Sequence, residues 1–116
     1  ATHHITVSAT IAKPFPPSLS DDEGHLANTE AEDRAMTTKV APGDTVIWQK
    51  GGNISSLDNI FETAGNDLFS KDPTKQRDGT WLGIIGALPP GTAESYSISY
   101  TLGGLSHTQD HRLKMR

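Results

Sequence analysis

The chain has 116 residues, ten basic against fourteen acidic side chains, a net charge of −4 and no cysteine. The lack of cysteine excludes disulfides, thiolate-bound zinc and iron–sulfur clusters. The sequence also has no basic cluster of the kind that nucleic acid requires, and no apolar run near the roughly 20 residues of a membrane span, so we expect neither partner.

The length predicts a single domain over residues 1–116. Only 34% of the residues are hydrophobic, and seven of them are aromatic, which predicts a lean core that depends on a few large side chains. Eleven glycines and seven prolines indicate many turns, and many turns favour short strands over long helices.

The sequence of the first third of the chain predicts two strands separated by a polar segment. Residues 3–11 alternate between apolar and polar side chains, the pattern of a half-buried strand, and the prolines that follow end it. Residues 18–35 are rich in acidic and small polar side chains, so we expect a polar loop with one short helical turn. Ser20 and Glu23 have the spacing of a helix cap. Residues 36–40 resume the extended pattern.

The middle of the chain begins with a turn at Pro42-Gly43-Asp44, because these residue types favour tight turns. A strand over 45–49 follows, with Val46 and Trp48 on one face, and another is expected over 54–61. Residues 63–78 then form a second polar loop in the prediction, which Phe69 attaches to the body of the domain.

The last third predicts strands over 79–85, 94–102 and 111–116. The second of these has its large apolar residues on one face, namely Tyr96, Ile98, Tyr100 and Leu102. The Gly103-Gly104 pair indicates a hairpin-like turn, followed by a short loop that contains histidine. With about seven short strands, the sequence predicts an all-β fold, a Greek-key β-sandwich with two long polar loops.

Two segments resemble the cupredoxin-like β-sandwich family: Val40-Ala41-Pro42-Gly43-Asp44-Thr45-Val46-Ile47-Trp48, and the Pro89-Pro90-Gly91-Thr92 turn before Tyr96-Ser97-Ile98-Ser99-Tyr100. The resemblance covers residues 36–116 and implies the fold. The type 1 copper site of that family uses two histidines, a cysteine and an axial methionine. This chain has no cysteine and no histidine near Leu57 or Asp58, where the first histidine ligand would be expected. His107 and Met115 stand roughly where the second histidine and the methionine would. The resemblance therefore does not imply blue-copper electron transfer.

The amino terminus contains a different candidate metal site. In Ala1-Thr2-His3, a free α-amine, two amide nitrogens and an imidazole supply the four nitrogens of a square-planar Cu(II) site, and His4 adds another nitrogen. Affinity would fall below neutral pH because protons compete for these ligands. The alternative, which we favour, is a solvated tail with two incidental histidines.

Two further groups of polar residues have weaker signals. Ser106, His107, Asp110 and His111 include the residue types of a catalytic triad, but residues this close in sequence rarely converge in that geometry. The second polar loop contains oxygen ligands suitable for Ca²⁺: Asp67, Asp72 and Asp78, with Glu62 and Asn66 nearby. A solvated loop is favoured, because basic side chains neutralise it: Lys71, Lys75 and Arg77.

Aromatic side chains offer a carbohydrate-binding alternative. Of the four large rings in strands, Trp48, Tyr96 and Tyr100 have the phase of core residues. Trp81 is the candidate for an exposed sugar-binding ring, because Leu82 and Ile84 compete with it for the inward face.

The sequence therefore favours a non-enzymatic binding or structural module that self-associates through its sheet edges or loops, with homo-oligomers as one outcome. A copper-binding protein and a carbohydrate-binding module are the alternatives. No signal peptide is recognisable, and Ala1 fits either a terminus left by signal cleavage or one left by loss of an initiator Met, so the compartment stays open.

Overall fold

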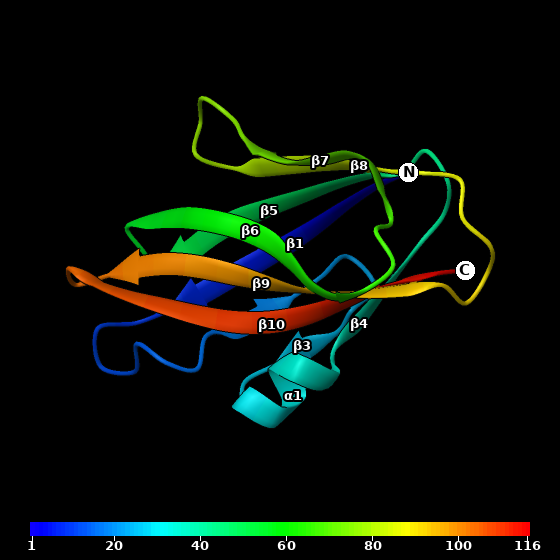
Figure 1. Cartoon of the computed structure of the whole chain (residues 1–116). Coiled ribbons are helices and arrows are strands. Elements are labelled where there is room, and N and C mark those ends of the chain that lie inside the picture. Colours follow the sequence, from blue (N-terminus) through cyan, green and yellow to red (C-terminus); the bar gives the residue numbers. More distant parts are fainter.

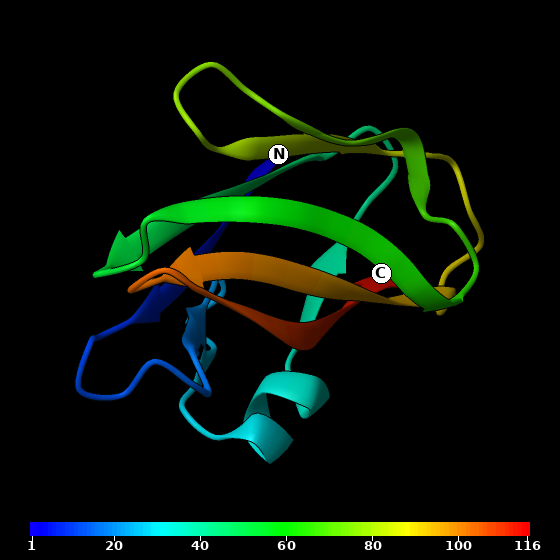
Figure 2. The same ribbon diagram turned by 60° about the vertical axis from the view of Figure 1, so that its left-hand side comes forward.

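The computed structural model describes residues 1–116, except for the side chain of Arg34. The chain forms two β-sheets that enclose one hydrophobic core (Figure 1). Turning the molecule by 60° shows β6, β9 and β10 as one layer and the sheet that contains β1 and β5 as the other (Figure 2). The all-β, sandwich-like architecture expected from the sequence is thus confirmed, while the Greek-key connection and the cupredoxin resemblance stay predictions.

The larger sheet has six strands in the order β3-β2-β1-β5-β8-β7. Their bounds are β1 Thr2–Ala9, β2 Ser18–Ser20, β3 Leu26–Ala27, β5 Thr45–Gly52, β7 Phe69–Lys75 and β8 Trp81–Ile85. The smaller sheet has the order β4-β10-β9-β6, with β4 Thr37–Val40, β6 Ser56–Gly65, β9 Ala93–Leu102 and β10 Leu105–Met115. Two pairs, β1 with β5 and β4 with β10, are parallel, and the others are antiparallel.

The core lies where the inward faces of the two sheets meet. Alternation along β1 buries Ile5 and Val7, as expected for a strand with one buried face. Trp48 of β5 and Tyr96 of β9 are both fully buried, and the indole Nε1 donates a hydrogen bond of 2.9 Å to the tyrosine hydroxyl. This bond joins the two sheets through the middle of the core.

A chain of hydrogen bonds continues from that tyrosine through the core. The Tyr96 hydroxyl donates to Nδ1 of buried His111, whose Nε2 lies 3.4 Å from Oγ1 of Thr38. The Thr38 hydroxyl in turn donates to Asp21 at 2.7 Å. Because Thr38 donates its only proton to Asp21, its oxygen must accept from Nε2–H of His111, and Nδ1 of the neutral ring then accepts from Tyr96. Burial lowers the pKa of His111 to about 3, so the ring is neutral at ordinary pH.

The first polar segment, 18–35, is more structured than predicted. It contains β2, β3 and the helix α1 (Glu30–Ala35). The predicted short helical turn is thus confirmed, but the prediction of a loop around it is wrong. The predicted cap is also wrong, because Ser20 lies in β2. Thr29 caps the helix by accepting a hydrogen bond from the amide of Glu32 at 3.1 Å. Fully buried Leu19 attaches β2 to the core.

Two later segments also differ from the prediction. The second polar loop, 63–78, contains the end of β6 and all of β7, so only residues 66–68 connect the two sheets there. The loop expected before residue 111 is absent, because β10 begins at Leu105 directly after the Gly103-Gly104 turn. Both glycines have positive φ, 60° and 79°, as the tightest hairpin turns require. No described helix is long and apolar enough to cross a membrane.

Candidate functional site

An acidic cleft lies between β6 and β7. These two strands are edge strands of opposite sheets (Figure 1). The volume of the cleft is about 250 Å³. Acidic and aromatic side chains make up most of its lining, which consists of Ile60, Phe61, Glu62, Asp67, Phe69, Asp72, Pro73, Glu94 and Tyr96.

Three elements supply the carboxylates that converge in this cleft. Glu62 comes from β6, Asp67 from the connection between the sheets and Glu94 from β9, and each places one oxygen within 4.8 Å of the others. Asp72 of β7 lines the same cleft. At the end of β6, Gly65 pairs with Glu94 of β9 at close range: its φ is 92°, and a Cβ would lie 2.5 Å from the carbonyl oxygen of Ala93. Only glycine fits this position without a shift of the backbone.

Glu94 is the deepest of the acidic side chains, with 1% of its surface exposed. Its Oε2 accepts a hydrogen bond of 3.3 Å from the amide of Leu68, whereas its Oε1 has no hydrogen-bond partner among the described residues. Burial and the neighbouring Glu62 carboxylate raise the pKa of Glu94 to about 8. A buried carboxyl oxygen without a partner is rare in folded proteins, because desolvation is then uncompensated.

The negative charge of the cleft is not neutralised by the described part of the chain. None of the ion pairs between described side chains involves Glu62, Asp67, Asp72 or Glu94. No described lining residue is basic. The lysines that were expected to neutralise this segment lie exposed on β7 without an ion pair to the cleft.

The apolar side of the cleft is built from aromatic rings. Phe61 is 42% exposed at the surface. Phe69 packs against Trp48 with a centroid separation of 5.9 Å, which agrees with its predicted role of attaching this segment to the core. Tyr96 is buried behind them.

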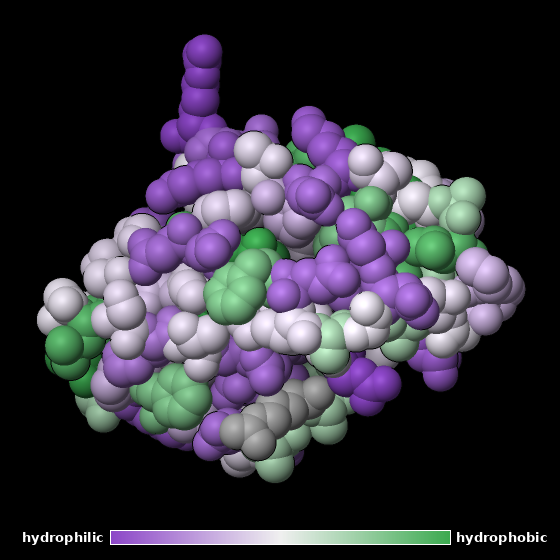
Figure 3. Space-filling view, in the orientation of Figure 1, coloured by the Kyte–Doolittle hydropathy of each residue, from purple (hydrophilic) through white to green (hydrophobic). Residues whose placement is uncertain are grey.

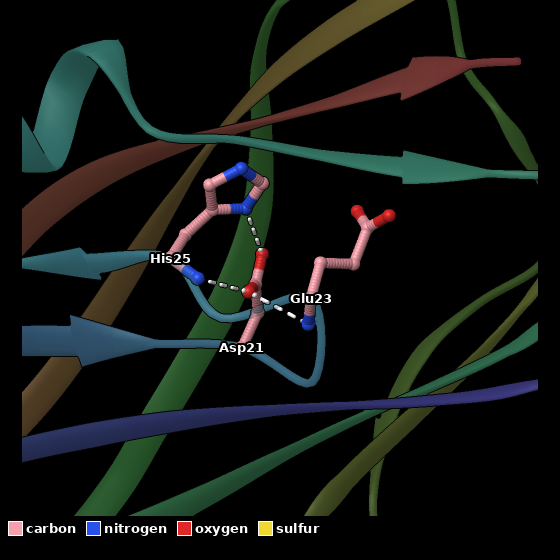
Figure 4. Close-up of side chains that lie close together, drawn as sticks. All are labelled: Asp21, Glu23 and His25. Atoms are coloured by element: carbon pink, nitrogen blue, oxygen red, sulfur yellow. Dashed lines mark hydrogen bonds and ion pairs between the residues drawn. The ribbon is translucent and has the colours of Figure 1, made fainter.

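A second acidic cluster, Asp21, Glu23 and His25, is a structural turn (Figure 4). Oδ1 of Asp21 accepts from the amides of Glu23 and His25, at 3.0 Å each, and Oδ2 lies 2.8 Å from Nδ1 of His25. The Glu23 carboxylate is paired with the amide of Lys39 and with Arg116. Each carboxylate oxygen in this cluster has a protein partner, so it offers no vacant ligand set.

The amino-terminal segment is not a solvated tail, because the Ala1 amine and the His3 ring both contact Asp44. The Ala1 ammonium lies 3.0 Å from Oδ1 of Asp44. His3 is only 3% exposed, and its ring lies between two carboxylates: Nε2 is 2.7 Å from Asp44 and Nδ1 is 3.2 Å from Asp22. Thr2 and His4 are exposed on the other face of β1. The amine and the imidazole are therefore both engaged with the Asp44 carboxylate, and copper binding by this segment stays a prediction.

The predicted sugar-binding ring is also placed differently. Trp81 is 9% exposed, and its Nε1 donates to the carbonyl oxygen of Leu57 at 3.0 Å. Trp81 and Ile85 take the inward face of β8, whereas Leu82 and Ile84 are half-buried, so the strand has the opposite phase to that expected. Trp81 presents no open face to a sugar.

The remaining polar candidates are dispersed. His107 and His111 both lie on β10, where His107 packs between Phe15 and Tyr100 and His111 belongs to the core network. Asp110 accepts a hydrogen bond from Ser97 at 2.6 Å. Asp78 accepts from the amide and hydroxyl of Thr80 in the turn between β7 and β8. Of the predicted Ca²⁺ ligands, only Glu62, Asp67 and Asp72 reach the cleft.

Comparison with known proteins shows a similar fold without close relatives. No protein-family model and no curated protein sequence matches the chain. An inclusion body protein, PixA, from Burkholderia cenocepacia is 9% identical with a TM-score of 0.54, and the match covers 99% of this chain and 94% of that one. Its likeness concerns the fold alone.

Two more distant solved structures also align with the chain. A cysteine protease inhibitor from Entamoeba histolytica is 14% identical with a TM-score of 0.41, and the match covers 97% of both chains. An endo-fucoidan hydrolase of glycoside hydrolase family 107 is 15% identical with a TM-score of 0.39, and the match covers 97% of this chain and 22% of that one. Neither likeness is close enough to bear on function.

Sequence reasoning missed Glu94, which is the centre of the site. The signal was present in the alternation of β9, where Glu94 shares its phase with inward-facing Tyr96, Ile98 and Tyr100. A carboxylate at an inward position of a strand is a candidate functional group, because a buried charge requires a partner.

Proposed function

We propose that this chain is a non-enzymatic binding module whose ligand is cationic and occupies the cleft between β6 and β7. One observation carries the proposal: Glu94 lines the cleft with a buried Oε1 that has no hydrogen-bond partner among the described residues. One carboxylate oxygen of Glu94 also lies within 4.8 Å of one oxygen each of Glu62 and Asp67. A positive charge placed between these three carboxyl groups would interact favourably with each of them.

Electrostatics supports a cation over other ligand classes. Burial and repulsion from the Glu62 carboxylate raise the pKa of Glu94 to about 8, so Glu94 is mostly protonated at neutral pH and a bound cation would displace that proton. The remaining carboxylates of the cleft repel one another, more strongly in a partly desolvated site than in water. Because no described basic side chain offsets it, a bound cation would relieve the repulsion directly. An anionic ligand would add to it.

The geometry gives less support to an enzyme that uses these carboxylates. Paired acids can cleave a glycosidic bond, but the acid must then reach the oxygen of the leaving group. Glu94 is 1% exposed, so a sugar ring has little access to it. The described lining also lacks serine, threonine and histidine, the usual nucleophiles and bases.

Self-association through strand edges also has less support. The β7 edge contains Lys71, Asp72 and Pro73, and the β6 edge is interrupted by two register shifts. Charged residues, proline and bulges all discourage pairing of edges. On the face seen in Figure 3, hydrophilic residues predominate and apolar residues form small separate patches.

The proposal is tested by NMR titration of uniformly ¹⁵N-labelled protein with a panel of ligands. CaCl₂, MgCl₂ and spermidine represent cations, whereas glucose and citrate represent neutral and anionic ligands. We expect at least one cation to shift the amide signals of residues 61–69 and 93–96, and glucose and citrate to leave them unchanged. The absence of such shifts with every cation would contradict the proposal.

A further inference from the structure

We propose that Glu62, Asp67 and Glu94 bind a divalent metal ion directly, of the hard, oxygen-preferring class that Ca²⁺ represents. This inference rests on the proposed function and names the cation. It assigns a direct ligand role to a residue from each of β6, β9 and the connection between the sheets.

The spacing of the oxygens matches one coordination sphere. Ca²⁺ binds oxygens at about 2.3–2.6 Å, so two ligands of the same ion lie at most about 5 Å apart. The three carboxylate oxygens lie within 4.8 Å of one another in the absence of any ion. A small inward movement of exposed Glu62 and Asp67 would complete the contact, and Glu94 is already held by the amide of Leu68.

The chemistry of the ligands selects the class of metal. All three are carboxylates, and neither histidine nor cysteine occurs in the described lining. Such a set favours Ca²⁺, Mg²⁺ or Mn²⁺ over zinc and copper, which prefer nitrogen and sulfur ligands. Ca²⁺ suits the site better than Mg²⁺, because two of the three ligands, Glu62 and Asp67, lie at exposed positions rather than in a closed octahedral cage.

The site also leaves room for further ligands. Ca²⁺ takes about six to eight oxygens, and three carboxylates supply only part of that number. Asp72 lines the same cleft and is a candidate fourth ligand, directly or through water, and the volume of about 250 Å³ accommodates several water molecules beside the ion.

The burial of Glu94 distinguishes a metal ion from an organic cation. The amine of a polyamine or of a lysine side chain is attached to an aliphatic segment, and the cleft must accommodate that segment as well. A bare ion approaches Oε1 of Glu94 without that requirement, even though only 1% of the residue is exposed. Contact with this buried oxygen therefore requires less rearrangement of the cleft for a small ion than for an amine on a chain.

Isothermal titration calorimetry of metal-free protein with CaCl₂ and with spermidine tests the inference. Three variants are compared with the wild type: Glu94→Gln, Asp67→Asn, and the control Asp78→Asn, which removes the same charge in the turn outside the cleft. We expect Ca²⁺ to bind the wild type and the control equally, and both cleft variants to weaken it at least about tenfold. Circular dichroism verifies that each variant folds, and exposed Asp67 keeps the test valid if Glu94→Gln does not fold.

The outcomes separate the two proposals. Spermidine binding to the cleft without Ca²⁺ binding would overturn the metal site and leave the cationic ligand standing. Ca²⁺ affinity that is the same in the wild type and all three variants would overturn the site, because the ion would then lie elsewhere. If neither cation binds, both proposals are wrong.

Discussion

The amide of Leu68 donates a hydrogen bond to Oε2 of Glu94 at 3.3 Å, while Oε1 of the same carboxyl has no hydrogen-bond partner among the described residues. The connection between the two sheets therefore orients a carboxyl from β9 and leaves one of its oxygens available. The same connection supplies Asp67, whose Oδ1 accepts from the amide of Phe69 at 2.9 Å. Two of the three converging acids are thus positioned by the backbone of one short segment.

Replacing Glu94 by glutamine should stabilise the metal-free protein at alkaline pH. Glutamine has nearly the same shape, is neutral, and can donate to the Glu62 carboxylate. The expected gain in the free energy of unfolding at about pH 9 is about 1–3 kcal/mol, the usual penalty of an unsatisfied buried group. Urea unfolding of both proteins with a chelator present measures it, and Asp78→Asn should show almost no gain.

The pH dependence of that gain follows from the pKa of Glu94. Its folded pKa of about 8 lies above the ordinary 4.5, so the native state holds an extra proton between these values. The wild type then loses stability as pH rises through this window, and the advantage of the glutamine variant should grow up to about pH 8 and level off. An advantage that is constant from pH 4.5 to pH 9 would contradict this account.

Tyr96→Phe should cost about 1–3 kcal/mol of stability, because it leaves two buried groups unsatisfied. The lost hydroxyl accepts from Trp48 Nε1 and donates to Nδ1 of His111. Tyr100→Phe is the matched control, since its hydroxyl has a single partner, the carbonyl oxygen of Pro14. Equilibrium unfolding in urea should show the larger loss for Tyr96→Phe, and equal losses would argue against the shared network.

His111→Gln should remove a source of acid sensitivity. Burial lowers the pKa of His111 from 6.5 to about 3, so in this window the unfolded chain binds a proton that the native state excludes. Wild-type stability is therefore reduced as pH falls below about 6.5. The advantage of the wild type over the variant should be largest above that pH and shrink toward pH 3 in unfolding curves measured across the range. An advantage that grows on acidification would show the opposite sign and refute the assignment.

Gly83→Ala should disturb the aromatic side of the cleft. A Cβ at Gly83 of β8 would lie 2.8 Å and 2.9 Å from two ring carbons of Phe69, so the ring must move. Overpacking of this kind costs about 1–3 kcal/mol. At Gly86, in contrast, an added Cβ would meet its neighbours at 3.4 Å or more, so Gly86→Ala should be nearly neutral. Thermal unfolding of the two variants compares them directly, and similar losses would mean that the ring moves freely.

The sequence predicted strands well where one face is buried. Alternation identified β1 and β9, because their side chains divide between core and surface with a period of two. It missed β7, whose residues are almost all exposed or half-buried at a sheet edge, so that no alternation is visible. It missed β2 and β3 because two or three residues are too few to show a period.

The site was harder to predict than the fold. The sequence placed Glu62, Asp67 and Asp72 among candidate Ca²⁺ ligands but favoured a solvated loop, and it assigned no role to Glu94. The three converging acids become neighbours only because β6 pairs with β9, a contact between residues far apart in the chain. The contacts of the amino terminus were hidden from the sequence for a similar reason, since Asp44 reaches His3 only through the pairing of β1 and β5.

The central claim is that the cleft holds a metal ion, and a crystal structure of the protein grown with MnCl₂ as an anomalous scatterer of the same ligand class tests it most directly. The account predicts an anomalous peak at about 2.0–2.6 Å from carboxylate oxygens of Glu62, Asp67 and Glu94. A cleft without a peak, or a peak only at other residues, would contradict it.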